Sequence, residues 1–194
     1  HVGIGLAAPA FADSSIVIGS KRFTESYILG EIARETLVRA GVRATHREGM
    51  GNTAVLFEAL KTGAIDAYPE YTGTVGRELL KSSETDIDAL DRGLAPYGLG
   101  VAIPLGFENT YALAMREGAA SRFGVNAIGD LSQQRDLRLG LSPEFLNRAD
   151  GWPGLARAYS LPQTPLVLDH GLAYEALAVG RIDAMDIYAT DAKI

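Results

Sequence analysis

Two tyrosines occupy matching places in a repeated segment, where their amphipathic rings could line a ligand site. Residues 58–71 read EALKTGAIDAYPEY and residues 175–188 read EALAVGRIDAMDIY, and eight of the fourteen positions are identical at an offset of 117. Each copy predicts a helix, a glycine at its end, a short strand and then Tyr71 or Tyr188. Ligands of open α/β sheets bind beyond the carboxyl ends of the strands. The repeat therefore predicts two related lobes, each giving one tyrosine to a site between them.

The same repeat also has a purely structural interpretation. The pattern Ala-Leu-x-x-Gly-x-Ile-Asp-Ala is a favourable helix–turn–strand unit, in which Tyr71 and Tyr188 are only good strand residues. This interpretation explains the packing residues better than it explains an aromatic side chain repeated at the strand exit. Asp66 and Asp183 fit turn or capping roles rather than catalysis. The residues alone leave both interpretations open.

Two basic residues stand where they could bind an anion. Lys21 lies between a predicted strand and a predicted helix, so its ammonium group could reach a cleft or remain in solvent. Arg148 lies near a predicted helix end, where its guanidinium could bind a carboxylate through two hydrogen bonds or pair with Asp150. Residues 109–111 lie where one predicted lobe leads into the other, which suits a hinge or a binding strand.

Little in the sequence indicates catalysis, a metal or a cofactor. The chain has no cysteine, which excludes disulfides, thiol nucleophiles and zinc ribbons, and its three histidines are widely scattered. It contains neither a Gly-x-Ser-x-Gly nor a His-Glu-x-x-His motif. We therefore expect no enzyme and no catalytic residue, metal ion or cofactor. The net charge of −6 also disfavours nucleic acid as a partner.

The elements that position these residues alternate between strand and helix. Apolar runs predict strands at 15–19, 42–47, 65–68, 99–103, 111–115, 137–141 and 166–168. Helical periodicity predicts helices at 25–40 with Thr24 as N-cap, and at 53–60, 74–80, 87–97, 144–148, 153–159 and 171–179. This alternation predicts an α/β protein with mostly parallel sheets.

The first residues differ from the rest of the chain. Residues 1–12 are small and apolar and end in Ala10-Phe11-Ala12, which is the pattern of a signal-peptidase site. We interpret them as the tail of a secretory signal peptide; an apolar linker or a vector remnant is the alternative. No later stretch reaches the roughly 18 apolar residues that a membrane helix needs. We expect a periplasmic or otherwise extracytoplasmic protein.

Five segments, in order along the chain, resemble the osmoprotectant substrate-binding proteins of ABC importers, which bind glycine betaine, choline and carnitine. They are IGSKRFTESYILG (18–30), IDAYPEYTGT (65–74), PLGFENTYAL (104–113), EFLNRADGWPGL (144–155) and IYATD (187–191). The resemblance implies a type II periplasmic-binding-protein fold, in which two α/β lobes close over a ligand in the cleft between them. We expect lobe 1 within residues 13–107 and lobe 2 within residues 108–194.

The resemblance also implies an aromatic cage for a quaternary ammonium group. Tyr71, Tyr111 and Tyr188 match its walls, and Asn109 matches a polar cage position that can be acidic in relatives. Such a cation has no N–H donors, so the faces of the rings must attract it, with about 0.5–2 kcal/mol for each ring. The cage gives the repeated tyrosines their function.

Other matched positions have polar roles. The resemblance makes Arg148 and Lys21 partners of the ligand's carboxylate, and Thr74 adds a hydroxyl group. Asn52 and Thr53 lie in a loop that tunes the choice of substrate in this family. Together with the cage, these roles make the chain a non-catalytic binding protein that passes its solute to a membrane permease, while a partner uses the ATP. Alternatives are a binder of another trimethylammonium amino-acid derivative such as ergothioneine, or the effector-sensing domain of a regulator.

Two departures from the family pattern carry further expectations. Family chains continue beyond the position of Asp191, return to the first lobe and supply another cage tyrosine, whereas this sequence ends at Ile194. We therefore expect a fold that is incomplete at its C-terminus: a fragment, a part of a longer natural protein, or a chain completed by a second copy in a domain-swapped homodimer. The second departure is Asn109, which removes a negative charge near the bound cation.

Overall fold

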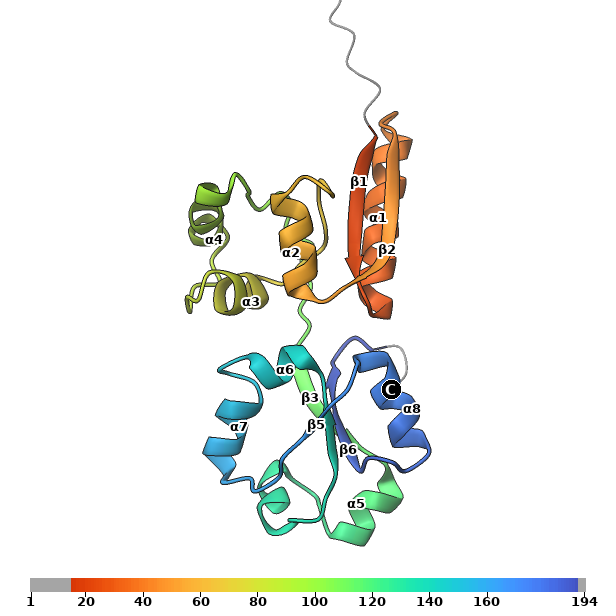
Figure 1. Ribbon diagram of the computed structural model, residues 1–194, viewed down its shortest axis with the longest axis vertical. Coiled ribbons are helices and arrows are strands. Elements are labelled where there is room, and N and C mark those ends of the chain that lie inside the picture. The colour runs from red at the N-terminus through yellow and green to blue at the C-terminus, as the bar shows by residue number, and fades with distance from the viewer. Residues whose placement is uncertain (1–14, 192–194) are drawn as a thin grey trace, which may run out of the picture.

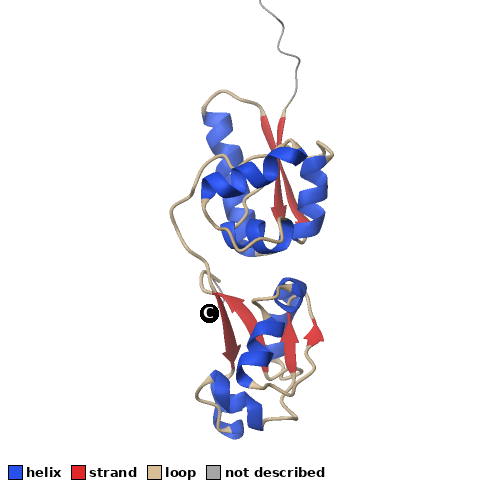
Figure 2. Ribbon diagram, turned by 90° about the vertical axis from the view of Figure 1, so that its left-hand side faces the viewer, coloured by secondary structure: helices blue, strands red, loops and turns tan. Residues whose placement is uncertain are grey.

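The elements of the chain lie in two groups. The computed structural model describes residues 15–191, so the signal-peptide interpretation of residues 1–12 lies outside the described residues. One group runs from β1 (Ile16–Lys21) to η2 (Ala95–Tyr97), and the other from β3 (Tyr111–Met115) to β6 (Ala184–Tyr188). Figure 1 shows one group above the other, and Figure 2 shows the long loop that joins them. We call them the first and the second group.

The first group contains a small parallel sheet and several helices. β1 pairs in parallel with β2 (Ala44–Gly51), and α1 (Thr24–Arg39) packs against both strands. The elements beside this unit in Figure 1 are α2 (Thr53–Lys61), α3 (Thr72–Thr74), the π-helical turn η1 (Val75–Leu79) and α4 (Ile87–Leu94). A buried cluster holds them together, made of Phe57, Val75, Leu90 and Leu94.

The second group is built on a four-stranded sheet in the order β3-β6-β4-β5, with β4 at Leu139–Leu141 and β5 at Leu166–Val167. β4 pairs in parallel with both neighbours, whereas β3 runs antiparallel to β6. The helical elements are α5 (Glu117–Phe123), η3 (Ile128–Gln133), α6 (Pro143–Asn147), α7 (Trp152–Tyr159) and α8 (His170–Ala178). The prediction of mostly parallel pairing is thus confirmed for the described strands, with the β3–β6 pair as the antiparallel exception.

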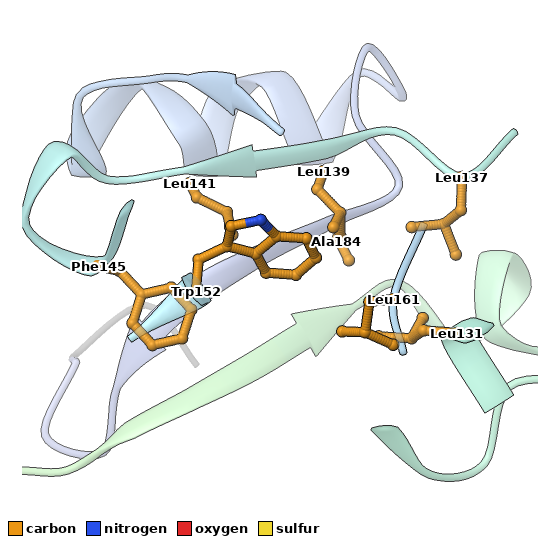
Figure 3. Close-up of a cluster of buried hydrophobic side chains, with 8 residues drawn as sticks. All are labelled: Leu131, Leu137, Leu139, Leu141, Phe145, Trp152, Leu161 and Ala184. Carbon is orange, nitrogen blue, oxygen red and sulfur yellow. The ribbon is translucent and has the colours of Figure 1, made fainter. Parts of the chain in front are cut away.

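A core of large apolar side chains fixes the helices of the second group against its sheet. In Figure 3 the indole of Trp152 lies beside Leu139 and Leu141, and Phe145 lies at one end of the cluster. The other members are Leu131, Leu137, Leu161 and Ala184. Burying such side chains contributes about 1.5–3 kcal/mol each. The core therefore fixes α6 and the residues that follow it, including Arg148.

The two copies of the repeat form the same hydrogen-bonded unit. Asp66 N–H donates to the Val17 carbonyl at 2.8 Å, and Asp66 Oδ2 accepts from Val17 N–H at 2.7 Å. Asp183 N–H donates to the Arg138 carbonyl at 2.8 Å, and Asp183 Oδ2 accepts from Arg138 N–H at 3.0 Å. Each aspartate thus ties its own segment to the start of a neighbouring strand. This refines the expected turn or capping role.

Two predicted strands are absent from the described residues. The segment 65–68 makes only an isolated bridge between Ala67 and Ile18, because Pro69 follows and has no N–H with which to extend the pairing. The segment 99–103 forms no strand: Leu99 and Val101 pack against the apolar cluster of the first group instead. The prediction of a strand at 99–103 was therefore wrong.

Other boundaries also differ from the sequence prediction. Thr24 is the first residue of α1, and Phe23 takes the N-cap position without a side-chain hydrogen bond to the helix. The predicted helix 74–80 is a short α-helix followed by the π-helical turn, and α5 and η3 were not predicted. The alternation of strands and helices nevertheless confirms the α/β class.

Candidate functional site

The three predicted cage tyrosines come from both groups. Tyr111 begins β3 and Tyr188 ends β6, and the antiparallel pairing places the two residues opposite each other. Their ring centroids are 5.2 Å apart. Tyr71 belongs to the first group, where it precedes α3 at the N-cap position. The second sheet therefore brings two of the tyrosines together, and the third comes from another element.

Phe23 links the rings of the two groups. It lies directly before α1, and its ring centroid is 5.1 Å from that of Tyr188. Lys21 Nζ lies 5.6 Å from the centroid of Phe23 and 5.3 Å from that of Tyr71. The sequence analysis missed Phe23 as a site residue, although it stands two positions after Lys21 in a segment that it singled out.

The hydroxyl group of Tyr71 is held by hydrogen bonds. It donates to Glu25 Oε1, while Asn109 Nδ2 donates to Glu25 Oε1 at 3.1 Å and to the Tyr71 hydroxyl at 3.3 Å. Burial, together with the bond to Glu25, raises the pKa of Tyr71 well above its ordinary value, so the phenol is neutral at pH 7. Because Asn109 lies just before β3, this cluster ties the first group to the entry of the second.

Tyr188 is held by ring packing, and its hydroxyl group also hydrogen-bonds to the side chain of Tyr111. The imidazole of His170 stacks on it with centroids 4.3 Å apart and planes inclined by 29°. Asp191 Oδ2 lies 2.7 Å from His170 Nε2 and accepts from Tyr174 OH at 2.7 Å and from Tyr188 N–H at 3.0 Å. Burial raises the pKa of Tyr188 well above its ordinary value. One carboxylate thus fixes the backbone of Tyr188 and the ring stacked on it.

Arg148 is paired with a carboxylate of its own chain. Its Nε and Nη2 donate to Asp150 Oδ1 and Oδ2 at 3.1 and 2.9 Å, which is the alternative that the sequence analysis left open. Its Nη1 donates to Thr74 Oγ1 of the first group at 3.2 Å, and its Cζ lies 5.4 Å from the ring centroid of Tyr111. Only 9% of the Arg148 side chain is exposed. Arg148 thus lies beside the tyrosines, at a contact between the two groups.

Lys21 is also paired. It ends β1 and is buried, and its Nζ lies 2.7 Å from Glu70 Oε1 and 3.4 Å from Thr53 Oγ1. A buried ammonium needs such a partner, since the loss of its hydration would otherwise be costly. Asn52, just before Thr53, caps α2 by accepting a hydrogen bond from Val55 N–H at 3.2 Å. Both cations that we expected to bind a ligand's carboxylate therefore already contact carboxylates of the chain.

The arrangement suits the binding of a cation by rings better than acid–base chemistry. Burial raises the pKa of Tyr71, Tyr111 and Tyr188 alike, so all three remain neutral phenols. The rings of Tyr71 and Phe23 already lie near an ammonium group, that of Lys21. Within residues 15–191, no cluster of acidic residues and histidines could hold a metal ion. No helix in that range is both long and apolar enough to cross a membrane.

A cavity of about 320 Å³ adjoins the site on the side of Glu25. The other residues that line it are Thr24, Ile28, Leu29, Phe107 and Thr190. None of the three tyrosines lines this cavity, because the rings of Tyr111 and Tyr188 lie against each other and against Phe145, His170 and Phe23. A ligand between the tyrosines would therefore have to separate rings that are in contact here.

Comparisons with known proteins give the chain its relatives. A family model described as the substrate binding domain of ABC-type glycine betaine transport systems matches residues 14–194. The ergothioneine transport permease/ergothioneine binding protein EgtU of Helicobacter pylori is 31% identical over 95% of this chain and 35% of its own length. The carnitine transport binding protein OpuCC of Listeria monocytogenes is 27% identical over 93% of this chain and 62% of its own length. The chain thus spans between a third and two thirds of these relatives.

A solved structure supports the fold directly. The apo form of YehZ from Escherichia coli is 27% identical, with a TM-score of 0.54 over 92% of this chain and 70% of that one. An ancestral arginine-binding protein shares the fold at 16% identity, with a TM-score of 0.61. The predicted α/β periplasmic-binding-protein fold is therefore confirmed.

Proposed function

The chain belongs to the family of substrate-binding domains of ABC-type glycine betaine transport systems, and on this premise we propose that it captures a quaternary-ammonium solute and delivers it to a membrane permease. The family binds solutes without transforming them, in agreement with the expectation that the chain is not an enzyme. Its members act outside the cytoplasm, where this chain would also work. The signal peptide and the domain-swapped homodimer stay predictions.

The observation that carries the proposal is the cluster of aromatic rings where the first and the second group meet. Tyr111 and Tyr188 lie 5.2 Å apart, and Phe23 extends the cluster into the first group, 5.1 Å from Tyr188. The rings of Tyr71 and Phe23 both lie near Lys21 Nζ, at 5.3 and 5.6 Å. Neutral phenol rings attract a trimethylammonium group through their negative faces, with about 0.5–2 kcal/mol for each ring. Tyr71, Tyr111 and Tyr188 would form the walls of the cage, and Asn109 its polar edge.

We expect two lobes to close over the ligand, because the cage residues come from both groups. We assign lobe 1 to residues 13–107 and lobe 2 to residues 108–194. The ligand would enter when the lobes are apart, take the place of ring-to-ring contacts and then bridge the lobes. A ligand that binds the closed state more tightly shifts the population toward it. The permease would recognise that state, and ATP would be used by the transporter's other components.

A carboxylate on the ligand would meet Arg148 and Lys21, with Thr74 adding a hydroxyl group. In this structure Asp150 and Glu70 contact those cations. A ligand with a carboxylate would therefore compete with the chain's own carboxylates, whereas choline would not. Glycine betaine, choline and carnitine are the first candidate solutes. Ergothioneine, which carries both a trimethylammonium group and a carboxylate, is the second, favoured by the 31% identity to a protein named for its transport.

Calorimetry tests the proposal. Glycine betaine, choline, carnitine and ergothioneine are titrated into the purified protein, with unmethylated glycine as the matched control. We expect binding of at least one trimethylammonium compound and none of glycine. Absence of binding to all four would contradict the proposal, and release of a chemically altered solute, detected by mass spectrometry, would indicate an enzyme instead.

The role of Arg148 has a test of its own. Arg148→Ala removes a group that can bind a carboxylate. We therefore expect it to weaken the binding of glycine betaine by about 1.5–3 kcal/mol and the binding of choline by much less. Arg157→Ala is the control, because Arg157 is exposed on α7. Equal losses for the two ligands would contradict the assigned role.

A further inference from the structure

A further set of contacts between the first group and the second group lies outside the aromatic cluster. We propose that Arg77 is a positioning residue: its ion pair with Asp150 latches the first group onto the second and so favours the closed form of the site. The inference rests on the proposed function, because closure over a solute gives the latch its purpose. Within residues 15–191, Arg77 forms no ion pair, hydrogen bond or ring contact with any of the cage tyrosines.

Local backbone structure presents Arg77 toward the second group. It lies in the π-helical turn Val75–Leu79, and π-helical turns are rare and frequently occur at functional sites. Gly76 is buried there, and a Cβ atom at that position would come within 2.1 Å of the Glu84 carbonyl oxygen. The turn is therefore packed too closely against the following loop for any larger residue. This packing fixes the backbone from which Arg77 extends.

Asp150 receives a cation from each group. Its Oδ2 lies 2.9 Å from Arg77 Nε of the first group and 2.9 Å from Arg148 Nη2 of the second. Arg148 in turn contacts Thr74 at 3.2 Å and lies 3.8 Å from Glu78 Oε1. Burial opposes ionisation of Asp150, but the hydrogen bonds and charges of Arg148 and Arg77 lower its pKa overall, so it is ionised at pH 7. The carboxylate separates two guanidinium groups that would otherwise repel each other.

This ion pair forms only when the groups approach each other, because its partners come from different groups. It therefore acts on the equilibrium between open and closed forms. The side chains of Arg77 and Asp150 are 43% and 34% exposed, which limits the strength of the pair. A pair of this kind shifts an equilibrium by about two- to fivefold. Arg77 would thus change the affinity for every ligand alike, whereas the loss of Arg148 also removes a partner of the ligand's carboxylate and affects carboxylated ligands more.

The closed population can be measured without any ligand. Because the chain has no cysteine, spin labels can be attached at Ser83→Cys and Ala158→Cys, which are exposed positions in the first and second groups. In the Arg77→Gln variant, we expect pulsed electron paramagnetic resonance to show a lower ratio of the shorter-distance to the longer-distance population. The ratio should decrease about two- to fivefold. Arg77→Lys should restore it. Arg92→Gln, an exposed arginine on α4 of the same group, is the control and should leave it unchanged.

Ligand binding gives the second readout. Arg77→Gln should raise the dissociation constants of choline and glycine betaine by the same two- to fivefold factor, mainly through faster dissociation in stopped-flow measurements. An unchanged distance distribution would overturn the latch, as would a loss confined to glycine betaine, which would place Arg77 with Arg148 instead. If the unsubstituted protein binds no trimethylammonium compound, the proposed function fails, while the distance measurement still decides whether the latch exists.

Discussion

In residues 58–71 and 175–188 the chain builds one unit twice. The backbone bond from the aspartate to the neighbouring strand measures 2.8 Å in both, from Asp66 to Val17 and from Asp183 to Arg138. Ile65 and Ile182 are each 1% exposed, and the helices before them begin after side-chain caps, Asn52 and Asp169. The backbone of the two units is therefore similar as far as the aspartates, beyond which the first copy makes only an isolated bridge and the second continues as β6.

The surroundings of the two tyrosines are not equivalent. Tyr71 is held through its hydroxyl group by Glu25 and Asn109, whereas the ring of Tyr188 packs against His170 and Phe23 and its hydroxyl bonds to Tyr111. All of these partners lie outside the two copies of the repeat, and His170 lies just before the second. The repeated residues thus supply a scaffold, and residues elsewhere decide whether its terminal tyrosine is fixed by polar contacts alone or also by ring packing.

Removing the two rings tests this difference most strongly. Tyr188→Ala should cost about 3 kcal/mol of unfolding free energy, because it leaves a cavity beside three other rings. It should also weaken the binding of every trimethylammonium ligand by about 2 kcal/mol, or roughly thirtyfold in affinity. Tyr71→Ala should cost less in both respects, since no other aromatic ring within residues 15–191 packs on that of Tyr71. Urea unfolding and calorimetry measure the two effects, and a larger cost for Tyr71→Ala would contradict the comparison.

The repeated aspartates should also differ. Asp183 is 1% exposed and accepts from Arg138 N–H, the Arg138 guanidinium and the Arg122 guanidinium, whereas Asp66 is exposed and accepts from Val17 N–H. Hydrogen bonds to a buried carboxylate are worth about 1.5–3 kcal/mol, and an exposed bond about 0.5–1 kcal/mol. Asp183→Asn should therefore destabilise the protein by about 2 kcal/mol and Asp66→Asn by less than about 1 kcal/mol. Equal losses in urea unfolding would show that burial does not distinguish the units.

Acid should reduce the contribution of Asp183 to the free energy of unfolding. Hydrogen bonds from Arg138 lower the pKa of this carboxyl in the folded protein below its value of 3.8 in the unfolded chain. Its stabilisation is therefore complete above that value and is lost as the pH falls through the folded-state pKa. The difference in unfolding free energy between the native protein and Asp183→Asn should accordingly decrease from pH 7 to pH 3. A difference that stays constant would exclude the charge as its source.

How much of this could be read from the sequence depends on the range of each contact. The helix and glycine of each copy were predictable because their signals lie within a few residues, although only the second copy forms the expected strand. The Arg148–Asp150 pair could be named as one of two alternatives because its partners are two positions apart. The bond between Lys21 and Glu70 spans 49 residues, and the antiparallel pairing of Tyr111 with Tyr188 joins distant segments. Glu25 and Phe23 escaped notice because their partners come from such distant segments.

Glycine positions offer a comparison in which the units should agree. Gly63 and Gly180 follow the two helices with φ of +71° and +73°. Alanine in this left-handed conformation costs about 1–2 kcal/mol. A Cβ at Gly63 meets open space, and one at Gly180 lies 2.8 Å from Arg116 Nη2, the end of a flexible side chain that can move. Gly63→Ala and Gly180→Ala should therefore destabilise the protein equally in thermal unfolding, and a difference of more than about 1 kcal/mol would mean that the backbones are not equivalent.

The smallest effect concerns the two phenol hydroxyl groups. Tyr71→Phe removes the bonds to Glu25 and Asn109, and one such bond contributes about 0.5–1.5 kcal/mol. We expect a two- to fivefold loss of choline affinity, because the ring of Tyr71 is no longer fixed. Tyr188→Phe loses the bond to Tyr111 but keeps the stack on His170 and the contact with Phe23, so its choline affinity should remain within about twofold of the native protein. If calorimetry instead finds the larger loss in Tyr188→Phe, the hydroxyl of Tyr188 contributes to the site and the distinction between the two tyrosines fails.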